Sequence, residues 1–253
     1  MFCMSKSNLA VKEEMEEVVV EEAILPNATA KNNVRVMYSE KTKTKKKIIY
    51  KIIKRMIDII GALIGTVLLI PVTIIIYFAR KFSKEEKGPL FYEQLRYGKN
   101  GKIFRLYKYR SMCIGADEKL KEYLANNEEA RKEFKKTHKL QNDPRITKIG
   151  NFLRKTSLDE LPQMINILKG DMSFVGPRPV VEKEVEEYGE KKEKFLSVKP
   201  GLTGYWQVNG RSNTTYEERM EMELYYVDNC SLWLDIKIFF KTFITVFKKE
   251  GAV

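Results

Sequence analysis

The chain has 253 residues, enough for one domain of ordinary size with additional segments. Its 46 lysines and arginines against 34 aspartates and glutamates give a net charge of +12 at pH 7, which favours an anionic partner: nucleic acid, acidic lipid or a phosphorylated substrate. Three scattered cysteines and one histidine, His138, argue against a disulfide framework, a zinc cluster and catalysis by a Ser-His-Asp triad.

Residues 1–47 are polar and lack sustained apolar periodicity. An acidic block over residues 13–22 is followed by a basic block over residues 41–47. Blocks of like charge are typical of a solvated tail, although a short helix over residues 13–25 is compatible with the pattern. No signal-peptide pattern is present, because the first long apolar run begins too late. We therefore predict that residues 1–47 form a charged, disordered tail.

The long apolar run at residues 59–79 could cross a bilayer, because about 21 residues of straight helix span roughly 31 Å. Pro71 lies inside the run and should kink it. Basic residues flank both ends, and positive charge marks the cytoplasmic side of a membrane. An ordinary spanning helix fits this run, and so does a re-entrant helix that bends at Pro71 and returns both flanks to one face.

A Lys54-Arg55-x-x-Asp58 motif stands at the edge of the apolar run. On a helix Lys54 and Asp58 are four residues apart and can form an ion pair. The basic residues suit an interfacial anchor as well as a place near an active site. Within the run, Gly61 and Gly65 form a Gly-x-x-x-Gly pattern, which indicates a helix contact in a homodimer.

Residues 88–110 have the pattern of a β-hairpin. A Gly/Asn turn at residues 98–101 separates two apolar segments, and Ile103, Leu106 and the tyrosines alternate with polar residues after it. Lys108 and Arg110 fall on the same side of the second strand. That face suits a polyanionic substrate, and a solvated strand face explains the same pattern.

Asp159 and Glu160 are adjacent acids that follow Ser157. Ser157-Leu-Asp-Glu160 fits a capping box, and apolar residues at helical spacing continue to Leu168 before Gly170. The pattern therefore predicts a helix that begins at Ser157 and ends at Gly170. Acids in such a position commonly do no more than cap a helix.

Basic residues cluster around these acids in the sequence. Arg154 precedes them, and Arg178 follows within Gly176-Pro-Arg-Pro179. Because Pro177 and Pro179 fix φ, this turn is stiff and would hold the arginine in place. Carboxylates beside arginines and a helix N-terminus make a site for a metal ion and phosphate groups.

Amphipathic and loop segments make up the rest of the chain. Residues 116–138 have the pattern of one or two surface helices, and residues 180–196 that of an exposed charged helix. Residues 199–211 form a glycine-containing loop that ends in Arg211. Residues 232–247 mix aromatic residues with lysines and are too interrupted to span a bilayer, which predicts a helix on the bilayer surface or against the core.

Two segments, Arg-Lys-Thr-Ser-Leu-Asp-Glu-Leu-Pro-Gln at residues 154–163 and Gly-Pro-Arg-Pro at residues 176–179, resemble the bacterial sugar transferase family, the monotopic polyprenyl-phosphate sugar-1-phosphate transferases or phosphoglycosyltransferases. The resemblance runs from about residue 54 to about residue 249, and it implies the short form of the family. We therefore expect a mixed α/β, mostly helical fold with a small β-hairpin. A re-entrant helix-break-helix at residues 48–82 and interfacial amphipathic helices would anchor a cytoplasmic-face catalytic domain at residues 83–253.

The resemblance implies transfer of a sugar-1-phosphate from a UDP-sugar to polyprenyl (undecaprenyl) phosphate, with release of UMP. This would be a first membrane step in the synthesis of capsule, exopolysaccharide or another glycoconjugate. Asp159 would attack and form an aspartyl phosphosugar, and Glu160 would hold Mg²⁺. The implied place is the cytoplasmic face of the bacterial inner membrane, with no nucleic acid as partner. The implied substrate-binding residues are Lys54, Arg55, Lys108, Arg110, Arg154, Pro177, Arg178, Pro179 and Arg211.

A non-catalytic, basic membrane-bound scaffold or binding module is the alternative. It predicts strongly salt-dependent binding without Mg²⁺-dependent release of UMP, and it would tolerate Asp159→Asn and Arg178→Ala. The sequence does not specify the sugar, because selective contacts depend on loop shape.

Overall fold

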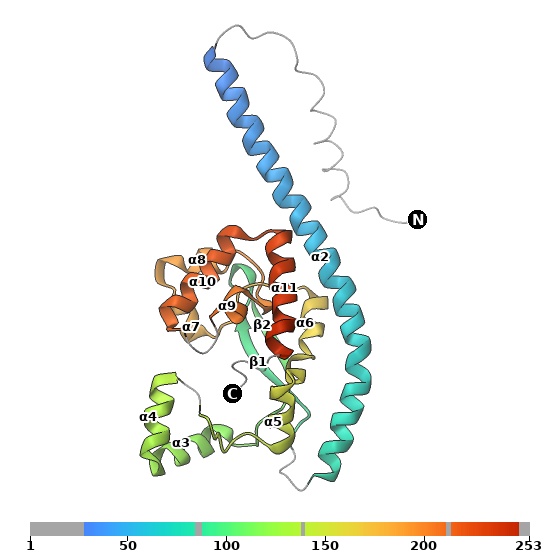
Figure 1. The fold of residues 1–253 in the computed structure, drawn as a ribbon, viewed down its shortest axis with the longest axis vertical. Coiled ribbons are helices and arrows are strands. Elements are labelled where there is room, and N and C mark those ends of the chain that lie inside the picture. The colour runs from blue at the N-terminus through green and yellow to red at the C-terminus, as the bar shows by residue number, and fades with distance from the viewer. Residues whose placement is uncertain (1–27, 84–87, 138–139, 211–213, 248–253) are drawn as a thin grey trace. The chain divides into compact units, whose positions relative to one another are not determined.

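The computed structural model describes residues 28–83, 88–137, 140–210 and 214–247. The chain divides into two units, residues 1–49 and residues 50–253, which are described separately. The first unit contains the beginning of helix α2 (Ala28–Phe82), and the second contains the rest of that helix with all the other described elements (Figure 1).

Helix α2 is continuous through Pro71, so the predicted break within residues 48–82 is not observed. Residues 28–47, which were predicted to belong to a disordered tail, are helical, and residues 1–27 lie outside the described residues. Proline is tolerated here because it removes a single backbone hydrogen bond and nearby threonines can stabilise the local backbone. Thr73 donates to the carbonyl of Leu69 at 2.6 Å, and its Oγ1 lies 2.5 Å from the hydroxyl of Tyr109.

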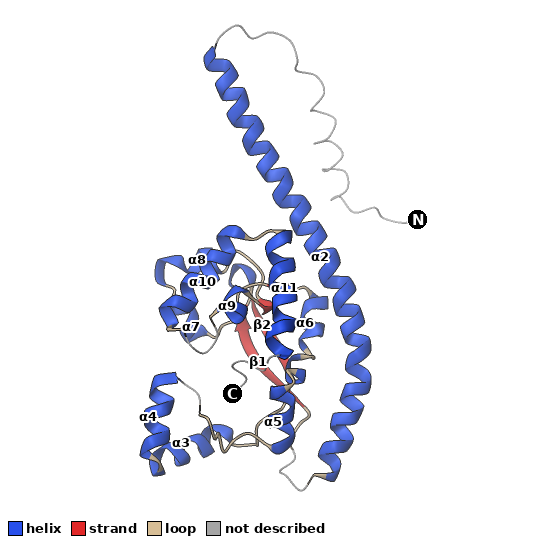
Figure 2. Ribbon diagram, viewed as in Figure 1, coloured by secondary structure: helices blue, strands red, loops and turns tan. Residues whose placement is uncertain are grey.

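The predicted hairpin is confirmed (Figure 2). Strands β1 (Phe91–Tyr97) and β2 (Ile103–Tyr109) pair antiparallel, and the 3-10 turn η1 (Lys99–Gly101) connects them. Asn100 and Gly101 have φ values of 56° and 76°, the left-handed region that this turn requires and that asparagine and glycine adopt readily. The turn therefore follows from local residue chemistry.

A second sheet was not predicted. Strands β3 (Ser173–Val175) and β4 (Gly201–Thr203) pair in parallel, with Ser173 opposite Gly201. A Cβ atom at Gly201 would lie 2.1 Å from the backbone nitrogen of Gly176, so only glycine allows this close approach. The pairing brings the loop before Arg178 against a segment more than 20 residues further along the chain.

Helices make up most of the remaining described chain, as predicted for a mostly helical fold. Residues 116–137, predicted to form one or two surface helices, form two, whereas residues 182–195 are divided into three short helices instead of one. The elements are α3 (Ala116–Asn126), α4 (Glu128–Thr137), α5 (Lys148–Lys155), η2 (Leu158–Glu160), α6 (Gln163–Lys169), α7 (Glu182–Glu186), η3 (Gly189–Lys191), α8 (Lys192–Phe195), α9 (Tyr205–Asn209), α10 (Tyr216–Asn229) and α11 (Leu232–Phe247).

Gly61 and Gly65 of α2 pack against strand β3 and helix α6 of the same chain. A Cβ atom at Gly61 would lie 2.6 Å from the ring of Phe174, and one at Gly65 would lie 2.7 Å from the sulfur of Met164. The Gly-x-x-x-Gly pattern therefore serves a contact within one chain, and it does not support the homodimer contact predicted from it. The core at this contact consists of Ala62, Phe104, Leu106, Met164, Ile167 and Met172.

Large apolar side chains remain exposed on two helices. The segment Lys47–Phe82 of α2 is long and apolar enough to cross a membrane, and Ile64, Val67 and Ile75 on it are each more than 60% exposed. On α11, Trp233 and Phe240 are also more than 60% exposed. Exposed apolar surface of this extent is typical of a lipid contact, which agrees with the prediction that both helices meet a bilayer.

Candidate active site

The two adjacent acids lie on a short 3-10 turn and not at the start of a long helix. Ser157 has a left-handed backbone (φ 56°) and its side chain makes no capping hydrogen bond, so the predicted capping box is wrong. A capping residue needs an extended backbone, which Ser157 does not have. The helix that follows, α6, begins at Gln163 and ends at Gly170 (φ 84°), and that predicted end is confirmed.

Lys108 of strand β2 forms an ion pair with Glu160. The distance between Nζ and Oε1 is 2.6 Å, and both side chains are only about one-quarter to one-third exposed (24% and 30%). Burial opposes ionisation of Glu160, but the charge and hydrogen bond of Lys108, with Arg178 and Gln163, hold the pKa of Glu160 below its ordinary value. Glu160 is therefore ionised at neutral pH.

Asp159 has the opposite electrostatic setting. Burial raises the pKa of Asp159 above its ordinary value, and the adjacent Glu160 adds to this rise, while Lys108 and Arg154 act against it. Arg154 is itself held by a 2.9 Å hydrogen bond from its Nε to Ser111 Oγ. No ion pair or side-chain hydrogen bond neutralises Asp159 within the part of the chain that the structure describes. A partly desolvated carboxylate of this kind is a better nucleophile than a paired one.

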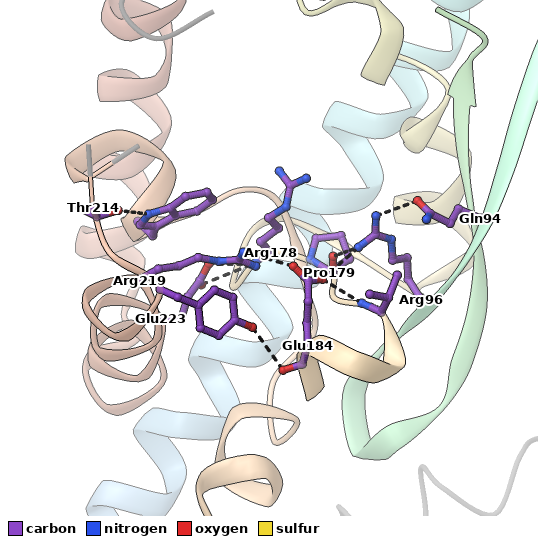
Figure 3. A network of polar contacts seen from close by, with 11 residues as sticks. Gln94, Arg96, Arg178, Pro179, Glu184, Thr214, Arg219 and Glu223 are labelled. Carbon is purple, nitrogen blue, oxygen red and sulfur yellow. Dashed lines mark hydrogen bonds and ion pairs between the residues drawn. The ribbon is translucent and has the colours of Figure 1, made fainter. Parts of the chain in front are cut away.

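Arg178 approaches these acids on the rigid turn predicted from the sequence. Pro177 and Pro179 are buried, and the backbone N–H of Arg178 donates to Glu223, whereas its guanidinium extends away from that acid (Figure 3). A small cleft then joins four segments that are distant in sequence. It is lined by Arg96, Leu106, Lys108, Glu160, Gln163, Arg178, Pro179, Gly201, Leu202 and Gln207.

Sequence reasoning missed Arg96 and the two glutamines of this cleft. Arg96 lies on β1 opposite Phe104 of β2, and its guanidinium donates to the carbonyl of Pro179 at 3.0 Å. Its position two residues before the hairpin turn was visible in the sequence, but nothing local indicates that its partner is more than 80 residues away. The cleft is lined by three cationic side chains and one carboxylate, a composition suited to an anionic group such as a phosphate.

The structure places the Lys54-Arg55-x-x-Asp58 motif in contacts between elements. Lys54 was predicted to pair with Asp58. It forms an ion pair with Asp235 of α11 instead, at 2.6 Å. Asp58 is buried and accepts hydrogen bonds from Ser173 Oγ (3.0 Å) and the backbone N–H of Phe174 (2.9 Å). These tertiary partners displaced the local i, i+4 pair because each one satisfies a buried polar group.

Two predicted substrate-binding arginines also make contacts within the chain. Arg55 donates to the carbonyls of Ile167 and Leu168 at the end of α6, at 2.6 and 2.8 Å. Arg110 donates to the carbonyl of Pro89 at 3.0 Å. Both arginines brace neighbouring segments, and their contact with substrate stays a prediction. Arg211 lies outside the described residues.

A second, larger cavity of about 640 Å³ adjoins the acids. It lies between α2, α6 and α11, and its walls are mainly apolar, with Ile64 and Leu68 on one side and Phe239 and Phe240 on another. Its lining also includes Glu160 of the acid pair. The site therefore combines a cationic cleft and an apolar cavity that share Glu160, an arrangement suited to one polar and one lipidic substrate.

The acid pair fits a magnesium ion only as part of a complex with substrate. The described residues contain no group of three or more histidine, cysteine or acidic side chains that could hold a metal ion. Magnesium commonly binds through one or two carboxylates together with substrate phosphates and water, so it needs no such group. Glu160, whose Oε1 accepts from Lys108 at 2.6 Å, would supply one such carboxylate beside the substrate phosphates.

Comparison with known proteins decides the family. The sequence pattern of the family described as "Bacterial sugar transferase" matches residues 49–249. The chain belongs to the bacterial sugar transferase family. The matched region of this sugar transferase contains the acid pair, the Gly-Pro-Arg-Pro turn, the cleft and the apolar cavity.

Several relatives are similar over the same region. The chain is 48% identical over 202 residues to the undecaprenyl-phosphate galactose phosphotransferase of Salmonella typhimurium, covering 80% of this chain and 42% of that protein. It is 42% identical over 206 residues to the UDP-glucose:undecaprenyl-phosphate glucose-1-phosphate transferase of Escherichia coli, covering 78% and 40%. It is 43% identical over 199 residues to the exopolysaccharide production protein ExoY of Sinorhizobium fredii, covering 79% and 87%. The chain thus spans less than half the length of the first two relatives.

Proposed function

We propose that this sugar transferase moves a sugar-1-phosphate from a UDP-sugar to a polyprenyl phosphate and releases UMP. The names of the Salmonella and Escherichia relatives support this reaction class, since both describe sugar-phosphate transfer to undecaprenyl phosphate. The observation that carries the proposal is that Glu160 lines both the cationic cleft and the apolar cavity. Glu160, next to Asp159, borders the cationic cleft and the apolar cavity alike, so a soluble phosphate donor and a lipid phosphate can reach one acid pair.

The donor half of the reaction uses the cationic cleft. Lys108 and Arg178 neutralise the diphosphate, and the rigid proline turn holds the Arg178 fork in place. An oxygen of Asp159 attacks the phosphorus that bears the sugar. A bond forms between that oxygen and phosphorus while the bond from phosphorus to the bridging oxygen breaks, and UMP leaves with that bond's electron pair.

The acceptor half regenerates Asp159. A phosphate oxygen of the polyprenyl phosphate attacks the aspartyl phosphosugar, the bond from Asp159 to phosphorus breaks, and the lipid diphosphosugar leaves. Glu160 would hold Mg²⁺ with the substrate phosphates, and when bound this ion would offset charge on the diphosphate. Lys108 keeps Glu160 ionised for that role.

The reaction is expected to occur at the cytoplasmic face of the bacterial inner membrane. Nucleotide sugars are cytoplasmic substrates, and the exposed apolar faces of α2 and α11 suit a bilayer that supplies the lipid. The relative from Sinorhizobium, named for exopolysaccharide production, supports a role in assembling a surface polysaccharide. A non-catalytic scaffold would need neither the shared acid pair nor the cationic cleft.

The proposal predicts Mg²⁺-dependent release of UMP from at least one UDP-sugar in the presence of polyprenyl phosphate. The assay screens glucose, galactose and N-acetylated amino-sugar donors and measures UMP together with the lipid product. Sealed inverted membrane vesicles should react without detergent because their cytoplasmic face points outward, whereas right-side-out vesicles should require detergent. Absence of UMP release with every donor would reject the proposed function.

The apolar cavity is expected to hold the first isoprene units of the acceptor. Ile64→Asn places a polar group on the cavity wall and should raise the KM for a long polyprenyl phosphate roughly tenfold, since about 1–2 kcal/mol of apolar contact is lost. The KM for the UDP-sugar and the KM for a short, water-soluble prenyl phosphate should change little.

Val67→Asn is the matched control, because Val67 is 68% exposed on the same helix and does not line the cavity. Equal effects of the two substitutions would mean that α2 contributes only general contact with lipid. No effect of Ile64→Asn on the long acceptor would place the polyprenyl chain elsewhere.

A further inference from the structure

Glu223 is a fully buried acid that contacts the active-site turn from behind. It lies in the middle of α10 with 0% of its surface exposed. Its carboxylate accepts the backbone N–H of Arg178, at 3.1 Å to Oε1 and 3.3 Å to Oε2 (Figure 3). Burying a carboxylate is unfavourable unless hydrogen bonds compensate. The hydrogen bonds from one backbone N–H offset only part of this desolvation penalty.

The peptide group on the other side of Arg178 is held as well. Arg96 Nη1 donates to the carbonyl of Pro179 at 3.0 Å and to Glu184 at 3.3 Å. Glu184 also accepts from Arg219, which lies one turn before Glu223 on α10, at 3.2 Å. Figure 3 shows these residues as one network of polar contacts that surrounds the turn. Within the described residues, none of the bonds uses the guanidinium of Arg178, which stays available to the cleft.

We propose that Glu223 is a positioning residue for Arg178: its buried carboxylate holds the backbone of the turn, with Arg96 on the opposite side, and so sets where the Arg178 guanidinium meets the donor diphosphate. This inference rests on the proposed function. It adds a role to α10, a helix that contributes no side chain to the lining of the cleft. Because Glu223 and Arg96 fix the backbone on both sides of Arg178, the position of its guanidinium is preorganised before a donor binds.

The charges around Glu223 give the positioning a dependence on pH. Burial raises the pKa of Glu223 to about 7, opposed by the N–H of Arg178 and the charges of Arg219 and Arg178, while Glu184 adds to the rise. Tyr188, whose buried hydroxyl has no hydrogen-bond partner among the described residues, also faces this acid. A protonated Glu223 accepts the Arg178 N–H less strongly, so donor binding should improve as pH rises through about 7.

Stability should change in the opposite direction over the same pH range. Because the folded pKa of Glu223 lies above its unfolded value, the folded state binds the proton more tightly, and this contribution to stability is lost as pH rises toward and through about 7. A residue with a purely structural role would make activity fall together with stability. Positioning by an ionised, buried Glu223 instead predicts that donor affinity rises while thermal stability falls.

The experiment measures kcat, KM for the UDP-sugar, the Kd for UDP and the Tm of the full chain from pH 5.5 to 8.5. Glu223→Asp keeps the charge but shortens the reach, and it should lower kcat/KM for the donor about tenfold, mostly through KM. Glu223→Gln keeps the reach without the charge, and it should remove the rise in affinity near pH 7 with a smaller loss at high pH. Glu221→Gln, an exposed acid on the same helix, is the matched control and should behave as the wild type.

A double-mutant cycle tests whether Glu223 acts through Arg178. In an Arg178→Ala background, Glu223→Asp should cause little further loss of UDP affinity, because the positioned group is gone. Additive losses in the two backgrounds would overturn the proposal, and so would a Glu223→Asp protein with wild-type kinetics. A wild-type protein that neither releases UMP nor binds UDP would instead overturn the proposed function, and this inference with it.

Discussion

Asp159→Asn should reduce lipid-linked product by about 10⁴-fold or more, because removal of a covalent nucleophile leaves only binding and electrostatic effects. The amide keeps the size of the side chain but cannot form the phosphoester. Incubation of wild-type protein with a labelled UDP-sugar and no acceptor should leave label on the protein, and the Asn variant should carry none. Normal turnover by Asp159→Asn would reject the covalent route while leaving the family assignment intact.

The same variant should fold at least as well as the wild type. Burial raises the pKa of Asp159, so the folded state pays a cost in keeping this carboxylate ionised at neutral pH, and a neutral amide removes it. Tm measured at pH 7.5 should therefore be equal or higher. Asp228→Asn serves as the control, since Asp228 is an exposed acid paired with Lys194 at 2.8 Å, and it should retain activity. A large fall in Tm for Asp159→Asn would make lost activity a folding effect.

The pH dependence of the first half-reaction follows from the same raised pKa. In the proposed mechanism Asp159 attacks only when ionised, so UMP release should begin to fall on acidification at a higher pH than an ordinary aspartate would allow. Because Arg154 acts against the rise, Arg154→Met should move this fall to still higher pH.

Glu160→Gln is expected to lower kcat by about 10²–10³-fold and to raise the Mg²⁺ concentration needed for half-maximal activity, because it removes a carboxylate ligand and leaves Lys108 without its 2.6 Å partner. Lys108→Met should act differently. Without the charge of Lys108, burial should raise the pKa of Glu160. Activity should therefore begin to fall on acidification at a higher pH than in the wild type.

The ion pair also predicts a stability effect with a defined sign. The pKa of Glu160 is depressed in the folded state, so its stabilising contribution is present above the unfolded pKa and is lost as pH falls through the folded pKa. Lys102→Met is the matched control, because Lys102 precedes the same strand, is 77% exposed and lies 3.5 Å from Asp171. If Lys108→Met and Lys102→Met gave the same pH profile, Lys108 would have no role in setting the charge of Glu160.

Features with local causes were predictable from the sequence. The hairpin follows from alternating residues and from Asn100 and Gly101, which adopt the positive φ that its turn requires. Gly170 ends α6 for the same reason, and the proline pair beside Arg178 makes a rigid turn whatever surrounds it. Each of these features depends only on residues within one turn or strand, so the local sequence contains the information needed to predict it.

Predictions failed where a distant partner competed with a local one. Ser157 looks like a helix cap, yet it takes a left-handed backbone between α5 and the 3-10 turn that carries the acids. Lys54 could pair with Asp58 on its own helix, but it pairs with Asp235, which lies 181 residues away. Sequence spacing predicts contacts only between residues that are close in the chain. In the folded core, each buried polar group is satisfied by the partner that packing brings closest.

The sequence alone determined which residue types the candidate site contains: an acid pair, arginines on a rigid turn, a basic hairpin and a long apolar helix, in an order that identifies the family. The tertiary structure decided which of these residues meet. It brought Lys108 to Glu160, placed Arg96 and Glu223 on either side of Arg178, and turned Gly61 and Gly65 inward against Phe174 and Met164. Residue types determine reactivity, but contacts between segments far apart in the chain exist only after packing, because their geometry depends on every element that lies between them.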